Sequence, residues 1–272
     1  PRLTWSFPIP PVEGCNPIGT PGYRAWKFNG DKKSSADWDL VFKKNEKHYP
    51  WSKKKKQAIW RGGSTGQPQK VKAHYVFSSL PRTNLVQHSI DNPTLIDAAF
   101  HELSQYFAHQ NNLKSQTRIA PPIAINDFMK YRAIIDIDGN GWSSRFGELL
   151  CMNSVVIKIQ PHFGEYIYKD IRPWEHYIPV YSNMTNLVDA VNFVVDGTKE
   201  RDVKKIIKNA HKWCRKANLR KNMAKDMLDI LVKYSDSIDS QDKNWRKNLK
   251  RNPIISGSEL DDLVEIDGQV PK

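Results

Sequence analysis

The sequence predicts an α/β fold built on a mostly parallel, Rossmann-like sheet. Two β-branched runs, residues 133–137 and 154–159, are separated by a glycine turn and an expected helix, which is the spacing of a βαβ unit. Two shorter apolar segments, residues 57–60 and 93–100, precede this unit. Strands that alternate with helices favour a parallel sheet of the nucleotide-binding type.

The elements follow one another in a simple order. Residues 1–50 are rich in Pro, Gly and Trp without periodicity, so we expect an irregular crossing segment there. The domain itself is expected over 51–250. Its last short strand covers 176–180, and a helix capped by Thr185 covers 187–195. Residues 251–272 are acidic and are expected to form a poorly ordered tail.

Composition is that of a globular protein, with 39% hydrophobic and 26% charged residues. No apolar run approaches the ~20 residues of a membrane span, and the chain carries no targeting signal. Three cysteines, Cys15, Cys151 and Cys214, form no pattern. An odd number cannot pair completely, and Cys151 in an apolar helix is expected to be a small buried residue.

The net charge of +13 is concentrated between residues 199 and 251. Apolar residues recur there at helical spacing, which predicts two packed helices with lysine-rich solvated faces. A module that binds nucleic acid or another anionic polymer is the alternative interpretation. The lysine run 53–56 is expected to be a solvated surface turn.

A calcium-like pattern follows the strand at 133–137. Asp136, Asp138, Asn140 and Gly141 match positions one, three, five and six of an EF-hand loop. Position twelve is Gly147 instead of a glutamate, and a strand precedes the pattern where an EF-hand needs a helix. We therefore expect no metal site.

The same stretch has the features of an anion site. A helix is expected to begin at Ser143 and Ser144, with Arg145 in its first turn, directly after a strand and a glycine turn. A second glycine loop, residues 61–66, also follows a strand and also brings an arginine, Arg61. Because the carboxyl ends of parallel strands share one crevice, Arg61 and Arg145 could converge on one diphosphate.

Four segments carry a resemblance to a known family: IWRGGSTG at 59–66, NPTLIDAAF at 92–100, YRAIIDIDGNGWSSRFGELLCMNSVVIK at 131–158 and RPWEHYIPV at 172–180. Their sequence, order and spacing resemble glycosyltransferase family 90. This lipopolysaccharide-modifying-enzyme-like family includes the protein O-glucosyltransferases and the fungal capsule-associated xylosyltransferases.

The resemblance implies a GT-B architecture, in which two Rossmann-like domains face each other across a cleft. This chain would be the C-terminal, nucleotide-sugar-binding half, and an N-terminal domain in cis would be largely missing. The implied reaction moves glucose or xylose from UDP-glucose or UDP-xylose to a protein or glycan hydroxyl with inversion. No metal, cofactor or nucleic-acid partner is expected, and the implied location is the lumen of the endoplasmic reticulum or Golgi.

By position, the resemblance assigns donor contacts to both glycine loops and to one arginine between them. The residues are Arg61, Gly62, Gly63, Ser64, Thr65, Arg82, Ser143, Ser144 and Arg145. Arginines would neutralise the charge that grows on the leaving UDP. The catalytic base has no counterpart here, because the family's aspartate belongs to the N-terminal domain. A transferase-like remnant that only binds ligand is therefore a further alternative.

Overall fold

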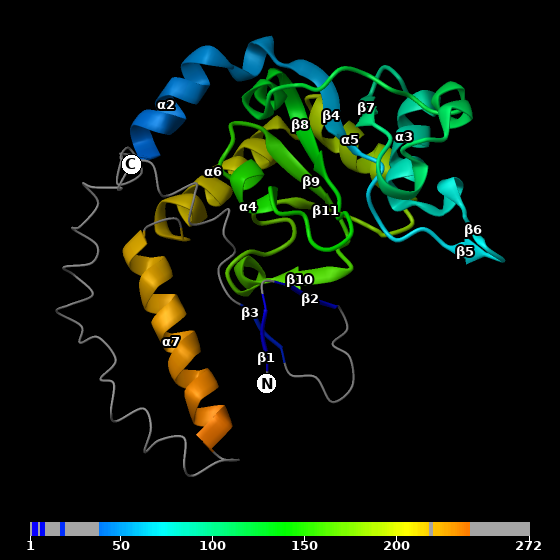
Figure 1. Cartoon of the computed structure of the whole chain (residues 1–272). Helices are drawn as coiled ribbons and strands as arrows, with labels where there is room; N and C mark the ends of the chain where they lie inside the picture. The colour runs from blue at the N-terminus through cyan, green and yellow to red at the C-terminus, as the bar shows by residue number, and fades with distance from the viewer. Residues whose placement is uncertain (1, 5, 9–16, 20–37, 218–219, 240–272) are drawn as a thin grey trace, which may run out of the picture.

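The computed structural model describes residues 2–4, 6–8, 17–19, 38–217 and 220–239 of the chain. Within them, a five-stranded parallel sheet lies between helices (Figure 1). The predicted α/β class with a parallel sheet is confirmed. The acidic segment 251–272, which we expected to form a tail, lies outside the described residues.

The sheet has the spatial order β11-β9-β8-β4-β7, and all neighbouring strands are parallel. Its strands are β4 (Lys55–Gly63), β7 (Ile96–Glu102), β8 (Tyr131–Asp136), β9 (Val155–Ile159) and β11 (Ile178–Val180). The chain adds β7 on one side of β4 and then crosses to the other side with β8. Strand order therefore reverses between β4 and β8, and open α/β sheets bind ligands at the carboxyl ends of such a pair.

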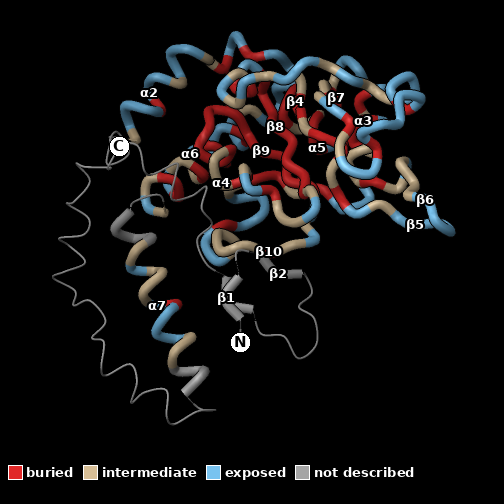
Figure 2. Tube along the Cα trace, viewed as in Figure 1, coloured by how far each residue is buried: buried red, intermediate tan, exposed pale blue. Residues whose placement is uncertain are grey.

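One face of the sheet packs against α3 (Pro81–Asp91) and α5 (Leu187–Val195). Trp60, Ile135 and Ile157 from three neighbouring strands form the centre of this core. Figure 2 shows the buried residues concentrated in the strands and in the parts of the helices that cover them. The alternation of apolar side chains along each strand supplies both faces.

The other face packs against α2 (Trp38–His48), α4 (Phe146–Leu150) and α6 (Glu200–Ala217). Ile134 and Val156 belong to this second core. The amphipathic pattern of α6 was correctly predicted, because its apolar residues are buried and its lysines are exposed.

The remaining described elements are short or peripheral. They are β1 (Arg2–Thr4), β2 (Ser6–Pro8), β3 (Pro17–Gly19), β5 (Lys70–Val71), β6 (His74–Tyr75), β10 (Phe163–Glu165), η1 (Trp51–Lys53), η2 (Phe77–Ser79), η3 (Gln105–Phe107), η4 (Asn111–Ser115), η5 (Ile125–Lys130), η6 (Tyr166–Lys169) and α7 (Arg220–Asp239). Helix α7 extends away from the sheet (Figure 1).

Three local predictions are wrong. Residues 38–48, expected to be irregular, form α2. Lys54, expected on a solvated turn, is buried, because its ammonium donates to the Met129 carbonyl and to Ser154 Oγ. The helix over 187–195 has the predicted bounds, but its N-cap is Asn186, since the Thr185 hydroxyl bonds to Asn183 instead.

The cysteine prediction is also wrong, because Cys151 and Cys214 form a disulfide with their Cα atoms 5.7 Å apart. The two residues are separated by 63 positions in the sequence, so no short sequence motif indicates the bond. Packing of α4 against α6 brings them together, and the disulfide then ties these two helices covalently. Among the described residues, no helix combines the length and the apolar character that crossing a bilayer would need.

Candidate functional site

The candidate site lies at the carboxyl ends of β4 and β8, where strand order reverses. Residues 64–66 leave β4 and residues 137–142 leave β8. The two loops touch directly, because the Gly66 amide donates to Asn140 Oδ1 at 2.9 Å. The parallel sheet thus brings the two predicted glycine loops together.

Arg82, in the first turn of α3, holds these loops in place. Its guanidinium donates to the carbonyls of Gly63 (2.9 Å) and Asp138 (3.0 Å) and to the Thr65 hydroxyl (2.5 Å). Gly139 permits this approach, since a Cβ atom there would lie 3.0 Å from Arg82 Nη2. Burial lowers the pKa of Arg82 to about 10, so the guanidinium stays charged at neutral pH.

A buried ionic network supports the loop after β8. Lys158 Nζ lies 2.8 Å from carboxylate oxygens of both Asp136 and Asp138. Asp138 also accepts the backbone amides of His162 and Phe163, which ties the loop after β9 to the same point. Burial alone would lower the pKa of Lys158, but the two carboxylates outweigh it and raise the pKa.

Arg145 and Ser143 are both oriented by Asp136. Arg145 Nε lies 3.8 Å from Asp136 Oδ1, and Ser143 Oγ donates to the same oxygen at 2.5 Å. Arg145 Nη1 also donates to the Arg61 carbonyl at 2.9 Å. The predicted helix start at Ser143 is therefore wrong. The Ser143 hydroxyl donates to Asp136, and α4 begins only at Phe146.

We call Arg82, Asp136, Asp138, Arg145 and Lys158 the edge cluster, because all five lie at or just below the carboxyl edge of the sheet. It contains three cations and two carboxylates, so positive charge is in excess. Such an excess beside glycine-containing loops can hold an anion, in particular a phosphate.

Arg61 has a different environment from the one we predicted. β4 extends through Gly63, so Arg61 belongs to a strand instead of a loop. Its guanidinium points back along the sheet to the carbonyl (2.7 Å) and carboxylate (2.8 Å) of Asp97. The same carboxylate binds Arg118 at 2.8 Å and accepts the Tyr131 hydroxyl at 2.7 Å.

We call Arg61, Asp97, Arg118 and Tyr131 the Asp97 cluster. In this cluster two guanidinium groups and a phenol converge on a single carboxylate. The side chain of Arg61 is thereby drawn away from Arg145, and only its carbonyl reaches the edge cluster. The predicted meeting of Arg61 and Arg145 on one diphosphate is therefore not seen.

The other residues predicted to contact the donor do not all lie at the site. Gly62 is a strand residue whose Cβ position is filled by the Trp60 ring, 2.5 Å away. Ser64 turns toward residue 104, because its hydroxyl accepts the Ser104 amide at 2.7 Å. Ser144 is exposed, whereas Gly63 and Thr65 are joined to the edge cluster through Arg82.

A crevice of about 300 Å³ opens beside the two loops. Ile137, Ile159 and Phe163 give it apolar walls, and Gln160 and Ser182 add polar groups. Small-molecule sites combine these two kinds of surface and begin at about this volume.

Sequence reasoning missed the central role of Lys158. A signal was present, since a charged residue in an otherwise apolar, β-branched run of a buried strand needs a buried partner. Asp136 and Asp138 were noticed only as part of the rejected calcium pattern. Glu165, which follows nearby on β10, was also missed, and burial raises its pKa to about 8.

Comparison with known proteins gives a consistent result. The model of Glycosyl transferase family 90 matches residues 21–251. Protein O-glucosyltransferase 3 of Homo sapiens is 25% identical over 234 residues, which cover 84% of this chain and 42% of the relative. Protein O-glucosyltransferase 1 of Mus musculus is 28% identical over 160 residues, which cover 58% of this chain and 37% of the relative. The chain thus spans about two fifths of the length of these relatives.

A solved structure of the wall teichoic acid polymerase TagF aligns with a TM-score of 0.33. The alignment covers 77% of this chain and 51% of that chain at 14% identity. This similarity is too distant to bear on fold or function.

Proposed function

Because the chain belongs to glycosyltransferase family 90, we propose that it forms the donor-binding half of a GT-B enzyme. The proposed reaction transfers glucose or xylose from UDP-glucose or UDP-xylose to a hydroxyl of a protein or glycan. A hydroxyl oxygen attacks the anomeric carbon with inversion, and the bond to the β-phosphate oxygen breaks. The base that accepts the hydroxyl proton has no assigned residue in this chain.

The observation that supports this proposal best is the Arg82 bridge. A single charged guanidinium fixes both glycine loops at the point where strand order reverses, which is where open α/β sheets hold phosphates. Arg145 adds a second guanidinium at the same edge. We propose that these two groups, without a metal ion, meet the donor diphosphate and stabilise the charge on the departing UDP.

The crevice beside the loops fits the nucleoside part of the donor. Its apolar walls, formed by Ile137, Ile159 and Phe163, can cover a flat base, and Gln160 and Ser182 can form hydrogen bonds. A nucleoside placed there would have its diphosphate beside the edge cluster, because Ile137 and Asp138 are consecutive and Asp138 lines the same crevice.

The disulfide supports a proposed location in the secretory pathway. Disulfides persist in oxidising compartments and are rare in the cytosol. The Cys151–Cys214 bond is therefore in keeping with the lumen of the endoplasmic reticulum or Golgi.

A thermal-shift titration with UDP tests the proposal. We expect saturable stabilisation by UDP that exceeds the effect of AMP or inorganic phosphate at equal concentration. Arg145→Ala should weaken UDP binding about tenfold, since a charge-assisted hydrogen bond contributes about 1.5–3 kcal/mol. Arg172→Ala is the matched control, because Arg172 is exposed and lies outside the edge cluster and the crevice.

No response to UDP from folded protein would contradict donor binding. Equal losses in Arg145→Ala and Arg172→Ala would contradict the position of the site. UDP binding without transfer, in a chain joined to its N-terminal domain, would favour the ligand-binding remnant. If UDP binding is absent and an anionic polymer binds with a steep salt dependence, the basic-module alternative is supported.

A further inference from the structure

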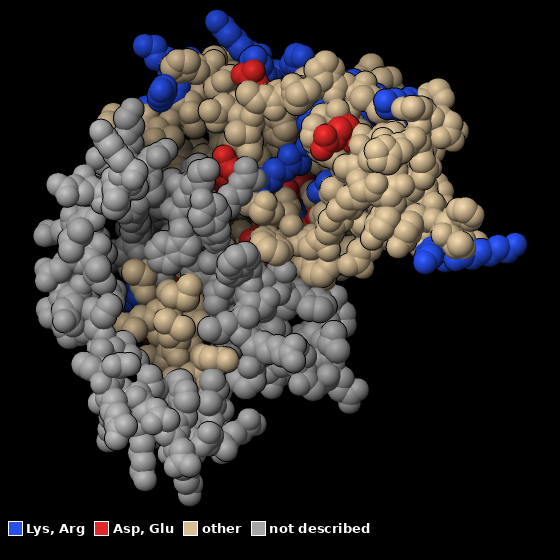
Figure 3. Space-filling model, viewed as in Figure 1, with Lys and Arg blue, Asp and Glu red and all other residues tan. Residues whose placement is uncertain are grey.

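Helices α2 and α6 form the walls of a groove of about 490 Å³ on the far side of the second core from the sheet. We call it the α2–α6 groove. Its cationic residues are Lys43, Lys204, Lys208, Lys212 and Arg215, and its carboxylate is Glu46. Figure 3 shows Lys and Arg side chains projecting from the upper edge of the molecule, over α2 and the start of β4. No part of the proposed donor site uses this surface.

The floor of the groove is aromatic and uncharged. Phe42 and Trp51 are buried in it, with 8% and 6% of their surfaces exposed. The His211 ring stacks on Phe42 with centroids 3.8 Å apart. Burial lowers the pKa of His211 to about 4, so the ring is neutral at physiological pH. Cations flank these rings, because Lys204 Nζ lies 5.9 Å from the Trp51 ring centroid and Arg215 Cζ lies 4.9 Å from that of Phe42. A ligand of this groove therefore meets partners for negative charge beside apolar surface.

Three of the lysines lack a partner within the part of the chain that the structure describes. Lys204 pairs with Glu200, and Arg215 pairs with Asp39. Lys43, Lys208 and Lys212, by contrast, form no ion pair with any described residue. Glu46 is itself engaged, since it accepts the Asn153 amide at 2.7 Å.

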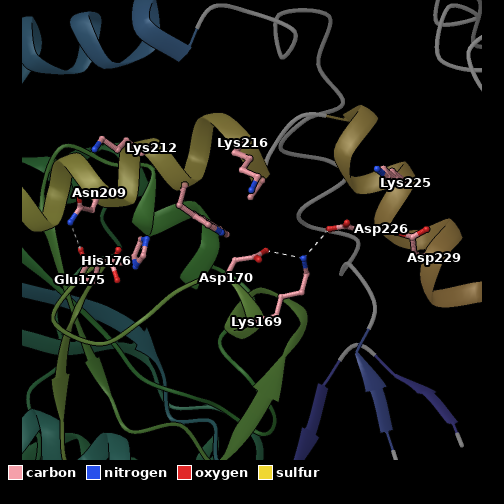
Figure 4. A pocket seen from close by; sticks show the side chains of 12 residues that line it. Lys169, Asp170, Glu175, His176, Asn209, Lys212, Lys216, Lys225, Asp226 and Asp229 are labelled. Atoms are coloured by element: carbon pink, nitrogen blue, oxygen red, sulfur yellow. Dashed lines mark hydrogen bonds and ion pairs between the residues drawn. The ribbon is translucent and has the colours of Figure 1, made fainter. Parts of the chain in front are cut away.

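A second groove, between α6 and α7, shows what distinguishes this one. It is larger, about 630 Å³, but its lysines, which include Lys212 shared with the α2–α6 groove, are matched by four carboxylates. Figure 4 shows Lys169 of that groove joined to both Asp170 and Asp226. Its charges compensate one another, whereas those of the α2–α6 groove do not.

The chain contains a segment with matching chemistry. Residues 258–267 read SELDDLVEID, and they combine five carboxylates with four apolar residues, Leu260, Leu263, Val264 and Ile266. No lysine or arginine occurs between Asn252 and Pro271. Glu259 lies 20 positions after the end of α7 at Asp239, and an extended chain of that length would reach up to ~66 Å.

We propose that the acidic segment 258–267 docks in the α2–α6 groove of its own chain. Its carboxylates pair with Lys43, Lys208 and Lys212, and its apolar residues cover the aromatic floor. The tether favours this occupant over a free peptide, because a covalent connection within one chain supplies an effective concentration on the order of millimolar. The proposal does not depend on donor binding.

Hydrogen exchange of the full-length chain tests the docking. We expect the backbone amides of 259–267 to exchange about tenfold more slowly than an unstructured peptide of the same sequence. The double variant Lys43→Glu/Lys208→Glu should remove this protection, because it reverses one charge on each wall. The matched control, Lys47→Glu/Lys205→Glu, reverses two equally exposed charges on the same two helices outside the groove.

A second full-length variant tests the segment itself. Replacing its five carboxylates by Asn or Gln should abolish the protection and lower the thermal midpoint only slightly, since the folded groove loses a weakly bound segment. Amides of 259–267 that exchange at unstructured rates in the unmodified chain would overturn the proposal. So would equal effects of the groove and control variants. Protection that rises with protein concentration would overturn it in favour of docking between two copies.

Discussion

The Asp97 cluster and the edge cluster each combine arginines with carboxylates and contain one more cation than carboxylates, yet the donors of their arginines are used differently. In the Asp97 cluster, two guanidinium groups and a phenol converge on one carboxylate. In the edge cluster, Arg82 instead donates to backbone carbonyls of two loops, and Lys158 is the cation that pairs with both carboxylates. The first arrangement engages both guanidinium groups with one carboxylate, whereas the second fixes the loops of the proposed donor site.

The largest effect should come from Lys158, the most deeply buried cation of the edge cluster. Lys158→Met would leave Asp136 and Asp138 buried without a compensating cation. We expect the free energy of unfolding to fall by about 3–5 kcal/mol, as it does when one member of a buried ion pair is removed. Urea denaturation measures this loss.

The matched control is Lys169→Met, because Lys169 also bridges two carboxylates, those of Asp170 and Asp226, but is exposed. Its loss should cost less than about 1 kcal/mol. A loss for Lys158→Met as small as that of the control would show that the edge cluster is not a buried ionic network.

The second prediction contrasts one arginine from each cluster. Arg82→Met should weaken UDP binding about tenfold or more, because the loops lose four hydrogen bonds to a charged group. Arg61→Met should leave UDP affinity within about twofold of the unmodified chain, although it lowers stability by removing a partner of Asp97. Isothermal titration at a temperature where all variants are folded separates the two effects.

The opposite order of the two losses in UDP affinity would be equally informative. If Arg61→Met weakened UDP binding more than Arg82→Met, Arg61 would have to leave Asp97 when the donor binds. The original expectation that Arg61 meets the diphosphate would then hold for the liganded protein, and the Asp97 cluster would serve as a resting position.

The elements of the sheet could be predicted because the sequence patterns that indicate them are local. The β-branched runs gave the positions of β8 and β9 and the apolar spacing gave α5 and α6, each within a few residues of the structure. Parallel pairing then placed the loops after β4 and β8 together. The position of the site followed from topology alone.

The side chains at the site could not be predicted, because their partners lie far away in sequence. The carboxylate bound by Arg61 belongs to Asp97, which lies 36 residues later in the sequence. The backbone carbonyl bound by Arg82 belongs to Asp138, which lies 56 residues later. Lys54, which looked like part of a solvated lysine run, is buried against Ser154, 100 residues away. The Cys151–Cys214 bond likewise depends on helix packing that no spacing reveals.

The smallest expected effect concerns Glu165, which couples the edge cluster to pH. Burial raises the pKa of Glu165 to about 8, and the nearby Asp136 and Asp138 charges act in the same direction. The group is therefore mostly neutral at pH 7 and becomes a carboxylate as the pH rises through about 8. That negative charge would lie beside the proposed diphosphate position, so UDP affinity should fall between pH 7 and pH 9.

Glu165→Gln isolates this contribution, because the amide cannot ionise. Over that pH range we expect a decrease of about threefold in UDP affinity for the unmodified chain and a flatter profile for the variant, as a screened charge interaction of under about 1 kcal/mol implies. Any titration of UDP itself affects both proteins alike, so the difference between the two profiles reports on Glu165. Parallel profiles would mean that Glu165 is electrostatically isolated from the donor, and the edge cluster alone would then set the charge of the site.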